Sequence, residues 1–533
     1  MKALLMRRDD DFDPGQVLVR REKESHMHQR YQETTLDELL PWNADALIQD
    51  LGLEILFEAM ALGDRFLFEV AEATILSPTT DVETILYRQD VLRDCMRLEP
   101  AVREMYQIAV VAIERERKNF WSLSGRYPAS TLYRAVEVLQ MFVGLLKELR
   151  RIADQNIGLA QSAGLSRFFS MLRHEISDDY FCEIERYLKQ LKFRRGVLIS
   201  AQLGMGNKGT AYVLHELPDA KSGWLLGRLW HNETGYTYWL HPRDESGARA
   251  LSELKNQGVN LAADALAKSA DHILSFFQML RTELGFYIGC LNLRKQLDEL
   301  GEPSCFPVPL PRGKQGLAFS ELYDVCLALK KGQKIVGNDL DAGPKGLIVI
   351  TGANTGGKST FLRGLGLGQL MMQSGMFVPA RTFTAEIRKG IYTHFKREED
   401  VTMESGKLDE ELLRMSEIVD HLGPDSLVLF NESFATTNER EGSEIARQVV
   451  SALTEKCVKC AFVTHLYDFA RRLYAEKRET AVFLRAERLS DGTRTFRLLL
   501  GEPLQTSYGK DLYTKIFGGR SAERTERVGR GFV

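Results

Sequence analysis

The feature that most constrains the fold of this 533-residue chain is an apolar run that leads into a glycine-rich loop and then a helical stretch. The run occupies residues 347–350, the loop reads GANTGGKS at residues 352–359, and the next residues read TFLRGL. This order is typical of a P-loop, in which glycines allow backbone N–H groups to turn inward and hold phosphate oxygens. We therefore predict a buried strand, a phosphate-binding loop and a helix whose positive N-terminal end faces the phosphates.

The residue types in this loop predict how it would hold a nucleoside triphosphate. We expect the Lys358 ammonium to reach the β- and γ-phosphates and the Ser359 hydroxyl to ligate Mg²⁺. The other residues of the predicted ATP-binding set are Gly352, Asn354, Thr355, Gly356, Gly357 and Thr360. ATP as substrate and Mg²⁺ as cofactor are thus the predicted ligands.

Composition limits the remaining possibilities. The net charge is -3, so any DNA contact must come from local patches or from a channel between two subunits. The 7 cysteines form no framework and no leader opens the chain, which favours a reducing cytoplasm. We interpret the lone CxxC of Cys457 and Cys460 as structural, because zinc needs two more ligands nearby. The most apolar stretch, residues 273–293, contains Arg281 and Glu283, so we predict no membrane span.

The N-terminal half of the chain has the apolar spacing of helices. Residues 1–40 are polar and are expected to form a poorly packed arm. We predict a mainly helical domain at residues 41–310, with helical spacing from 44 to about 191 and again from about 261 to 300. One stripe is expected to be core, namely Leu132, Val136, Leu139, Val143 and Leu146.

A strand-like segment interrupts this helical pattern. Between residues 196 and 241, β-prone runs are separated by Gly and Asn, which predicts a small β-rich insertion. Residues 204–209 spell GxGxxG, but a strand-like run follows where a dinucleotide-binding fold needs a helix. We therefore predict a hairpin turn at these glycines.

The C-terminal half alternates strands and helices. Residues 311–518 are expected to form an α/β domain, with a Pro- and Gly-rich linker at 303–316 and a basic tail at 519–533.

Two apolar runs of the α/β domain end in candidate catalytic residues. Residues 426–430 lead to Asn431 and Glu432, and a carboxylate at such a strand tip is placed to orient or deprotonate the attacking water. Residues 460–463 lead to Thr464 and His465, whose imidazole could sense the γ-phosphate. A helix-capping Thr464 with an incidental His465 is the alternative.

These segments together resemble the ATPase domain of the MutS family of DNA mismatch repair proteins. The resemblance covers about residues 335–518, and residues 79–96 and 284–307 resemble, more weakly, the family's helical lever domain. It rests on GANTGGKSTFLR, on SGMFVPA at 374–380, on SLVLFNE at 426–432, on Thr437 and Gly442, on VTH at 463–465, and on residues 495–497 and 507–509.

The resemblance implies an ABC-type α/β P-loop ATPase domain preceded by a mainly α-helical lever domain with a small β-containing insertion. In such proteins ATP binding and hydrolysis are coupled to closure of a dimer around DNA, with a Ser of one subunit facing the γ-phosphate bound by the other. Ser405 lies at about that place, just before an expected helix at residues 409–419. A helix N-cap is the alternative for Ser405.

Two departures from the family pattern are visible. The family's Walker B Asp is Asn431 here, which keeps an oxygen for the metal site but loses the negative charge, so slow hydrolysis is expected. The lever resemblance begins near residue 45, which leaves no room for the family's mismatch-reading and connector domains. Residues 181–183 have the letters of its Phe-x-Glu wedge, but they lie in an amphipathic helical stretch and are predicted to be scaffold.

The sequence thus predicts a cytoplasmic, homodimeric, ATP-dependent DNA-binding protein that recognises DNA structure rather than mismatches. The candidate phosphate contacts, each an ordinary solvated cation by default, are Lys192, Arg194, Arg195, Arg520, Arg524, Arg527 and Arg530. The alternative is a nucleotide-gated scaffold with little hydrolysis that docks a protein partner. Asn431 favours the scaffold, whereas Glu432 and His465 favour the enzyme.

Overall fold

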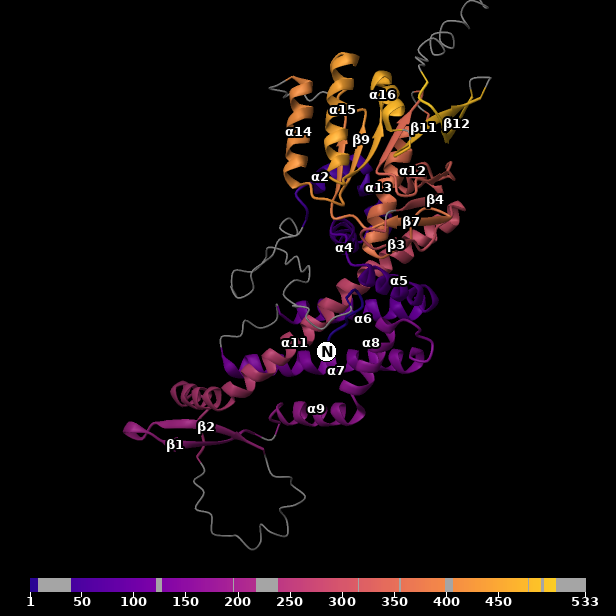
Figure 1. Cartoon of the computed structure of the whole chain (residues 1–533). Helices are drawn as coiled ribbons and strands as arrows, with labels where there is room; N and C mark the ends of the chain where they lie inside the picture. Colours follow the sequence, from indigo (N-terminus) through magenta and orange to yellow (C-terminus); the bar gives the residue numbers. More distant parts are fainter. Residues whose placement is uncertain are drawn as a thin grey trace, which may run out of the picture. The chain divides into compact units, whose positions relative to one another are not determined.

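The computed structural model describes residues 1–7, 40–120, 127–194, 196–216, 238–314, 316–353, 356–397, 406–477, 479–489 and 493–504. The chain divides into two compact units (Figure 1). The first is formed mainly by the described part of Arg97–Leu284, and the second by the described parts of Arg20–Met96 and Gly285–Val533. None of the described helices is long and apolar enough to cross a membrane.

The first unit is mainly helical and covers less of the chain than the helical domain predicted at residues 41–310. Its elements are α6 (Glu99–Phe120), α7 (Pro128–Asn156), α8 (Ala163–Glu175), α9 (Asp178–Gln190), β1 (Leu198–Leu203), β2 (Gly209–His215) and the larger part of α11 (Glu245–Leu300). The predicted core stripe is confirmed, because all five of its residues are buried on α7. Ser162 and Ser177 begin α8 and α9 by accepting backbone N–H bonds, which satisfies donors that a helix start leaves free.

The predicted hairpin turn at the GxGxxG letters is confirmed. β1 and β2 pair antiparallel, and the turn between them passes through Gly206, whose φ of 69° favours glycine. Ile199 of β1 packs closely against Gly258 of α11, where a side chain on the glycine would collide with it. A small apolar cluster around Leu132, Val259 and Ala263 supports this hairpin.

Two sequence-based boundaries were wrong. α11 begins at Glu245 rather than near residue 261, and its first turns are mostly exposed. The predicted linker at 303–316 contains strand β3 (Val308–Leu310), which pairs with β7 (Thr382–Glu386). Local Pro and Gly content cannot reveal a strand partner that lies more than seventy residues away along the chain.

The second unit contains two sheets. The larger has six strands in the order β12-β11-β6-β10-β9-β8, and only β12 runs antiparallel to its neighbour. These strands are β6 (Leu347–Thr351), β8 (Ile391–Phe395), β9 (Leu427–Asn431), β10 (Lys459–Val463), β11 (Ala481–Arg488) and β12 (Arg494–Leu500). The smaller has the order β3-β7-β4-β5, in which β4 is Leu317–Leu322 and β5 is Asn338–Asp341.

Helices cover both faces of the six-stranded sheet (Figure 1). One apolar core joins Val428 and Phe430 of β9 to α14 (Lys407–His421), α15 (Glu439–Glu455) and α16 (Tyr467–Lys477). On the other face Leu429 meets Gly366 of α13 (Lys358–Ser374). The remaining helices of this unit are α2 (Ala44–Leu51), α3 (Leu53–Ala61), α4 (Arg65–Leu76), α5 (Val82–Arg97) and α12 (Val325–Lys331). Parallel strands between helix layers bring the carboxyl ends of β6, β9 and β10 to one edge.

Candidate active site

The glycine-rich loop connects the strand and the helix that the sequence predicts. β6 ends at Thr351, and α13 begins at Lys358 after Gly357, whose φ is 88°. Gly352 also has a positive φ, at 119°. Asn354 and Thr355 lie outside the described residues. The first turn of α13 therefore presents its free N–H groups at the carboxyl edge of the sheet, where an anion would be stabilised.

The β11–β12 pair packs directly on this loop and gives its glycines a second reason to lack side chains. A Cβ on Gly352 or Gly356 would lie 2.9 or 2.7 Å from Ala486, and a Cβ on Gly357 would lie 3.2 Å from the carbonyl oxygen of Phe496. The sequence shows the glycines, but not these neighbours that make them necessary.

Lys358 is buried inside the loop, with 4% of its surface exposed. Its Nζ donates to Gly352 O at 2.9 Å and to Ala353 O at 2.8 Å. Burial lowers the pKa of Lys358 to about 8, the Glu432 carboxylate opposes this shift, and the Arg494 guanidinium adds to it. The poorly solvated Lys358 ammonium thus lies near a second cation, Arg494 at the start of β12. Sequence reasoning missed Arg494.

The two predicted metal ligands, Ser359 and Asn431, form a hydrogen bond with each other. The Ser359 hydroxyl donates to Asn431 Oδ1 at 2.8 Å, because the tip of β9 lies at the same edge of the sheet as the loop. Both are hard oxygen donors of the kind that Mg²⁺ prefers, so the pair fits that ion. Within the described part of the chain, no group of three or more His, Cys, Asp or Glu side chains could hold a metal. A bound Mg²⁺ would therefore need phosphate and water oxygens to complete its shell.

The two candidate catalytic residues lie on the tips of neighbouring strands and contact each other. His465 Nε2 lies 3.0 Å from Glu432 Oε1, and both side chains are about one-third exposed. The hydrogen bond from His465 lowers the pKa of the Glu432 carboxyl, Lys358 and Lys396 act in the same direction, and burial opposes them. Glu432 is therefore an ionised acceptor at neutral pH, as a general base must be.

The alternative interpretation of the Thr464-His465 pair also finds support in the geometry. The Thr464 hydroxyl accepts the Leu466 N–H at 2.9 Å, just before α16 begins, which is a capping contact. His465, however, pairs with Glu432 and is not incidental to the site.

A layer of buried polar groups behind Glu432 was not visible in the sequence. Ser433 Oγ donates to His394 O at 2.6 Å, and Glu411 Oε2 accepts the Phe434 N–H at 2.6 Å. Burial lowers the pKa of His394 to about 4, so its imidazole is neutral. Gly442 packs against this layer and has no room for a side chain, because a Cβ there would lie 2.2 Å from Phe434 O.

Other residues singled out from the sequence lie elsewhere. Ser405, Arg195 and the tail arginines fall outside the described residues. In the first unit, Lys192 is paired with Glu137 at 2.9 Å, while Arg194 is exposed. Phe181 is buried on α9 with Lys147 Nζ 5.3 Å from its ring centre, as expected for a scaffold residue, whereas Cys182 and Glu183 are exposed.

The CxxC cysteines of the second unit have free thiols, with Cys457 exposed and Cys460 buried. Burial raises the pKa of Cys460 to about 12, so its thiol is unreactive at neutral pH.

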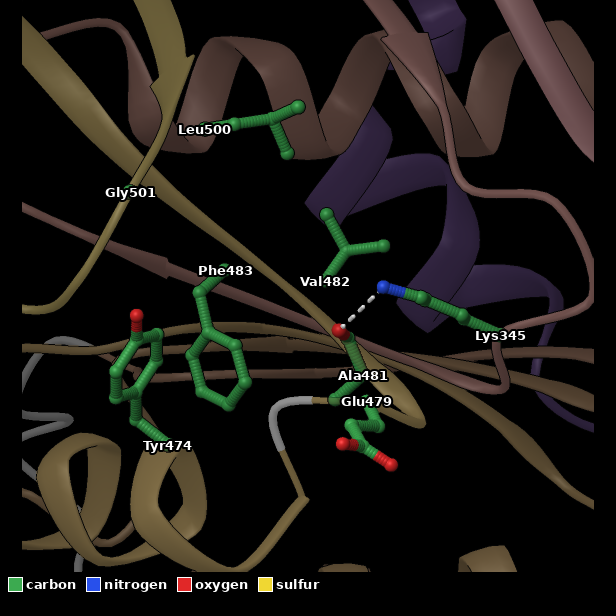
Figure 2. A pocket seen from close by; sticks show the side chains of 8 residues that line it. All are labelled: Lys345, Tyr474, Glu479, Ala481, Val482, Phe483, Leu500 and Gly501. Atoms are coloured by element: carbon green, nitrogen blue, oxygen red, sulfur yellow. Dashed lines mark hydrogen bonds between the residues drawn. The ribbon is translucent and has the colours of Figure 1, made fainter.

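Figure 2 shows a hollow of about 340 Å³ in the same unit. Its lining includes Lys345, Tyr474, Phe483 and Leu500, and Lys345 Nζ donates to Ala481 O at 3.2 Å across it. Lys345 precedes β6 and Ala481 begins β11, so the hollow lies near the amino ends of these parallel strands. It contains none of the predicted ATP-binding residues, which follow the carboxyl end of β6.

Comparison with known proteins agrees with this architecture. Residues 80–300 match a family model described as the MutS2 N-terminal domain, and residues 348–516 match one described as MutS domain V. An endonuclease MutS2 of Carboxydothermus hydrogenoformans is 25% identical over 454 residues, which are 82% of this chain and 54% of the relative. A DNA mismatch repair protein MutS of Leptospira interrogans is 26% identical over 267 residues, 47% of this chain and 31% of the relative.

A second endonuclease MutS2, from Clostridium acetobutylicum, is 34% identical over 158 residues, 29% of this chain and 20% of the relative. The chain thus spans between a fifth and about half the length of these curated relatives. Two family models match it over separate stretches, in the order helical unit and then P-loop domain. The chain belongs to the MutS family.

Proposed function

We propose that this chain is an ATPase that couples ATP binding and hydrolysis to DNA binding. The observation that carries the proposal is the meeting of Lys358, the Ser359–Asn431 oxygen pair and the Glu432–His465 pair at one edge of a parallel sheet. A phosphate cradle, metal-binding oxygens and an ionised base are the parts that phosphoryl transfer to water requires.

In the proposed reaction, ATP and water give ADP and inorganic phosphate. Lys358 leaves the carbonyl oxygens of Gly352 and Ala353 and binds the β- and γ-phosphates, with the N–H groups of the loop and of Thr360 around them. Oxygens of Ser359 and Asn431 would hold Mg²⁺, which would neutralise charge on the phosphates. Glu432 takes a proton from the attacking water, while His465 orients the carboxylate.

The wider organisation is also a proposal. We infer an N-terminal arm at 1–40, a helical lever domain at 41–310 with a β-rich insertion at 196–241, an ATPase domain at 311–518 and a basic tail at 519–533. Two copies would close on ATP, with Ser405 of one facing the γ-phosphate of the other, and would open after hydrolysis. DNA would be bound in the cytoplasm by shape, through phosphate contacts such as one from the exposed Arg194.

A second candidate is a nucleotide-gated scaffold that hydrolyses ATP very slowly and docks a protein partner. The observation that favours it is Asn431, because a neutral amide attracts Mg²⁺ more weakly than a carboxylate would.

Steady-state ATP turnover, measured with and without paired and four-way DNA, separates the two candidates. The ATPase predicts turnover that changes with DNA, together with DNA binding that weakens steeply as salt rises, since phosphate contacts release counterions. Tight ATP binding with no turnover above that of Glu432→Gln under any condition would favour the scaffold. Absence of ATP binding would refute both.

A further inference from the structure

The turn that follows β9 has an unfavourable backbone conformation at two nearby residues. Glu432 and Phe434 have φ angles of 55° and 61°, a region that residues with side chains rarely adopt. Such conformations cost free energy and persist only where the surrounding structure holds them. The side chain of the proposed base therefore depends on whatever fixes this turn.

Contacts from α14 hold the turn at its end. Glu411 Oε2 accepts the Phe434 N–H at 2.6 Å, and only 3% of Glu411 is exposed. Arg414, one turn further along the helix, donates to Phe395 O at 3.1 Å from both terminal nitrogens, which ties α14 to β8 as well. Burial raises the pKa of the Glu411 carboxyl, while the bond from the Phe434 N–H and the Arg414 guanidinium oppose this shift. In its ionised form the carboxylate accepts a charge-assisted bond, which is short and strong.

His394 of β8 links the same helix to the middle of the turn. Its Nε2 lies 2.9 Å from Glu411 O, its Nδ1 lies 2.7 Å from Ser433 Oγ, and its ring stacks on Phe434 with 5.3 Å between ring centres. Neither His394 nor Ser433 has any exposed surface. A neutral imidazole with its proton on Nε2 donates to Glu411 O. The Ser433 hydroxyl has a single proton, which it donates either to His394 O or to His394 Nδ1. The turn is thus fastened to α14 at two points, one direct and one through His394.

We propose that Glu411 is a positioning residue for ATP hydrolysis, which holds the Phe434 amide from α14 and thereby fixes the turn that aims Glu432 at the attacking water. The inference rests on the proposed ATPase function and deepens it. α14 begins at Lys407, two residues after Ser405, the residue proposed to reach the partner's nucleotide. A movement of α14 would therefore change the position of Glu432 through Glu411, whose side chain does not contact ATP in the proposed reaction.

Three variants of the full-length protein test this role. Glu411→Ala removes the acceptor of the Phe434 N–H, Glu411→Gln keeps an oxygen that can accept it, and Glu417→Ala removes an exposed carboxylate from the same helix as a control. We expect Glu411→Ala to lower kcat at least about tenfold while the Kd for ATP stays within about twofold, because misaimed catalytic groups lose rate rather than binding. Glu411→Gln should keep most of the rate, and Glu417→Ala should match the parent.

Hydrogen exchange without nucleotide gives a second readout that does not need turnover. Peptides covering residues 431–437 should exchange faster in Glu411→Ala than in the parent, with exchange in α13 unchanged and the midpoint of thermal unfolding close to that of Glu417→Ala. An unchanged kcat in Glu411→Ala, or a loss in Glu411→Gln as large as in the alanine variant, would overturn the inference. Hydrogen exchange at residues 431–437 that is as slow in Glu411→Ala as in the parent would also overturn the inference. If the parent shows no turnover, the ATPase proposal fails, and exchange alone then decides whether Glu411 holds the turn.

Discussion

The two sides of the candidate active site are built in opposite ways. The phosphate side is a contiguous loop at residues 352–359, which acts through backbone groups and through Lys358. The water-activating side is assembled from the tips of β9 and β10 and is supported by β8 and α14. On the first side the positive φ angles belong to glycines, whereas on the second they belong to Glu432 and Phe434.

This difference separates binding from turnover. A glycine-rich loop reaches its conformation at little steric cost, so nucleotide binding should tolerate changes elsewhere in the domain. A turn held by side chains depends on each of those contacts, so hydrolysis should respond to changes well away from the nucleotide. Substitutions on the two sides therefore test whether ATP binding and ATP turnover depend on different residues.

The largest effect is expected at Glu432. Glu432→Gln should reduce kcat by about a thousandfold, because the amide can hold water but cannot accept its proton. The Kd for ATP should stay within about twofold of the parent, since the carboxylate is not part of the phosphate cradle. Single-turnover hydrolysis and titration with a fluorescent ATP analogue measure the two quantities. Unchanged turnover would show that Glu432 is not the base.

The reverse pattern is expected at Lys358. Lys358→Ala should raise the Kd for ATP by about a hundredfold, which corresponds to about 3 kcal/mol for charge-assisted bonds to phosphate in a poorly solvated loop. Lys330→Ala, which removes an exposed lysine from α12, is the matched control and should bind as the parent does. Equal affinity of Lys358→Ala and Lys330→Ala in the same titration would mean that the phosphate site is elsewhere.

The same difference explains what the sequence could reveal. The strand, loop and helix around Lys358 were predicted correctly because all their determinants are local. The tips of β9 and β10 could also be predicted, since apolar strands followed by polar residues share an edge of a parallel sheet.

The support behind Glu432 could not be predicted. Ser433 and His394 are separated by 39 residues, and Phe434 and Glu411 by 23. No spacing rule joins such pairs, because they meet only after β8, β9 and α14 have packed together. Buried polar side chains of this kind also lack the apolar signature by which core positions are recognised.

An intermediate effect is expected at His465. Without its hydrogen bond the pKa of Glu432 should rise, because that bond is the largest cause of its lowering. The carboxylate would then become protonated at higher pH, so the acid limb of the pH–kcat profile should move upward in His465→Ala. At pH 7 we expect a loss of about tenfold in kcat with little change in ATP affinity. An acid limb that stays in place would show that His465 does not tune the base.

The smallest effect is expected at Asn431, where the two sides of the site meet through the 2.8 Å bond from Ser359 Oγ to Asn431 Oδ1. Asn431→Asp keeps that acceptor and adds a negative charge beside the expected metal, so the Mg²⁺ concentration for half-maximal turnover should fall by about threefold to tenfold. kcat should rise slightly or stay constant, because Glu432 and its supports are untouched. Mg²⁺ titrations of turnover in parent and variant test this, with circular dichroism to verify folding. A folded variant that loses turnover would show that the site is built around a neutral amide. The water-activating side would then extend to the metal oxygens, and the scaffold function would gain support.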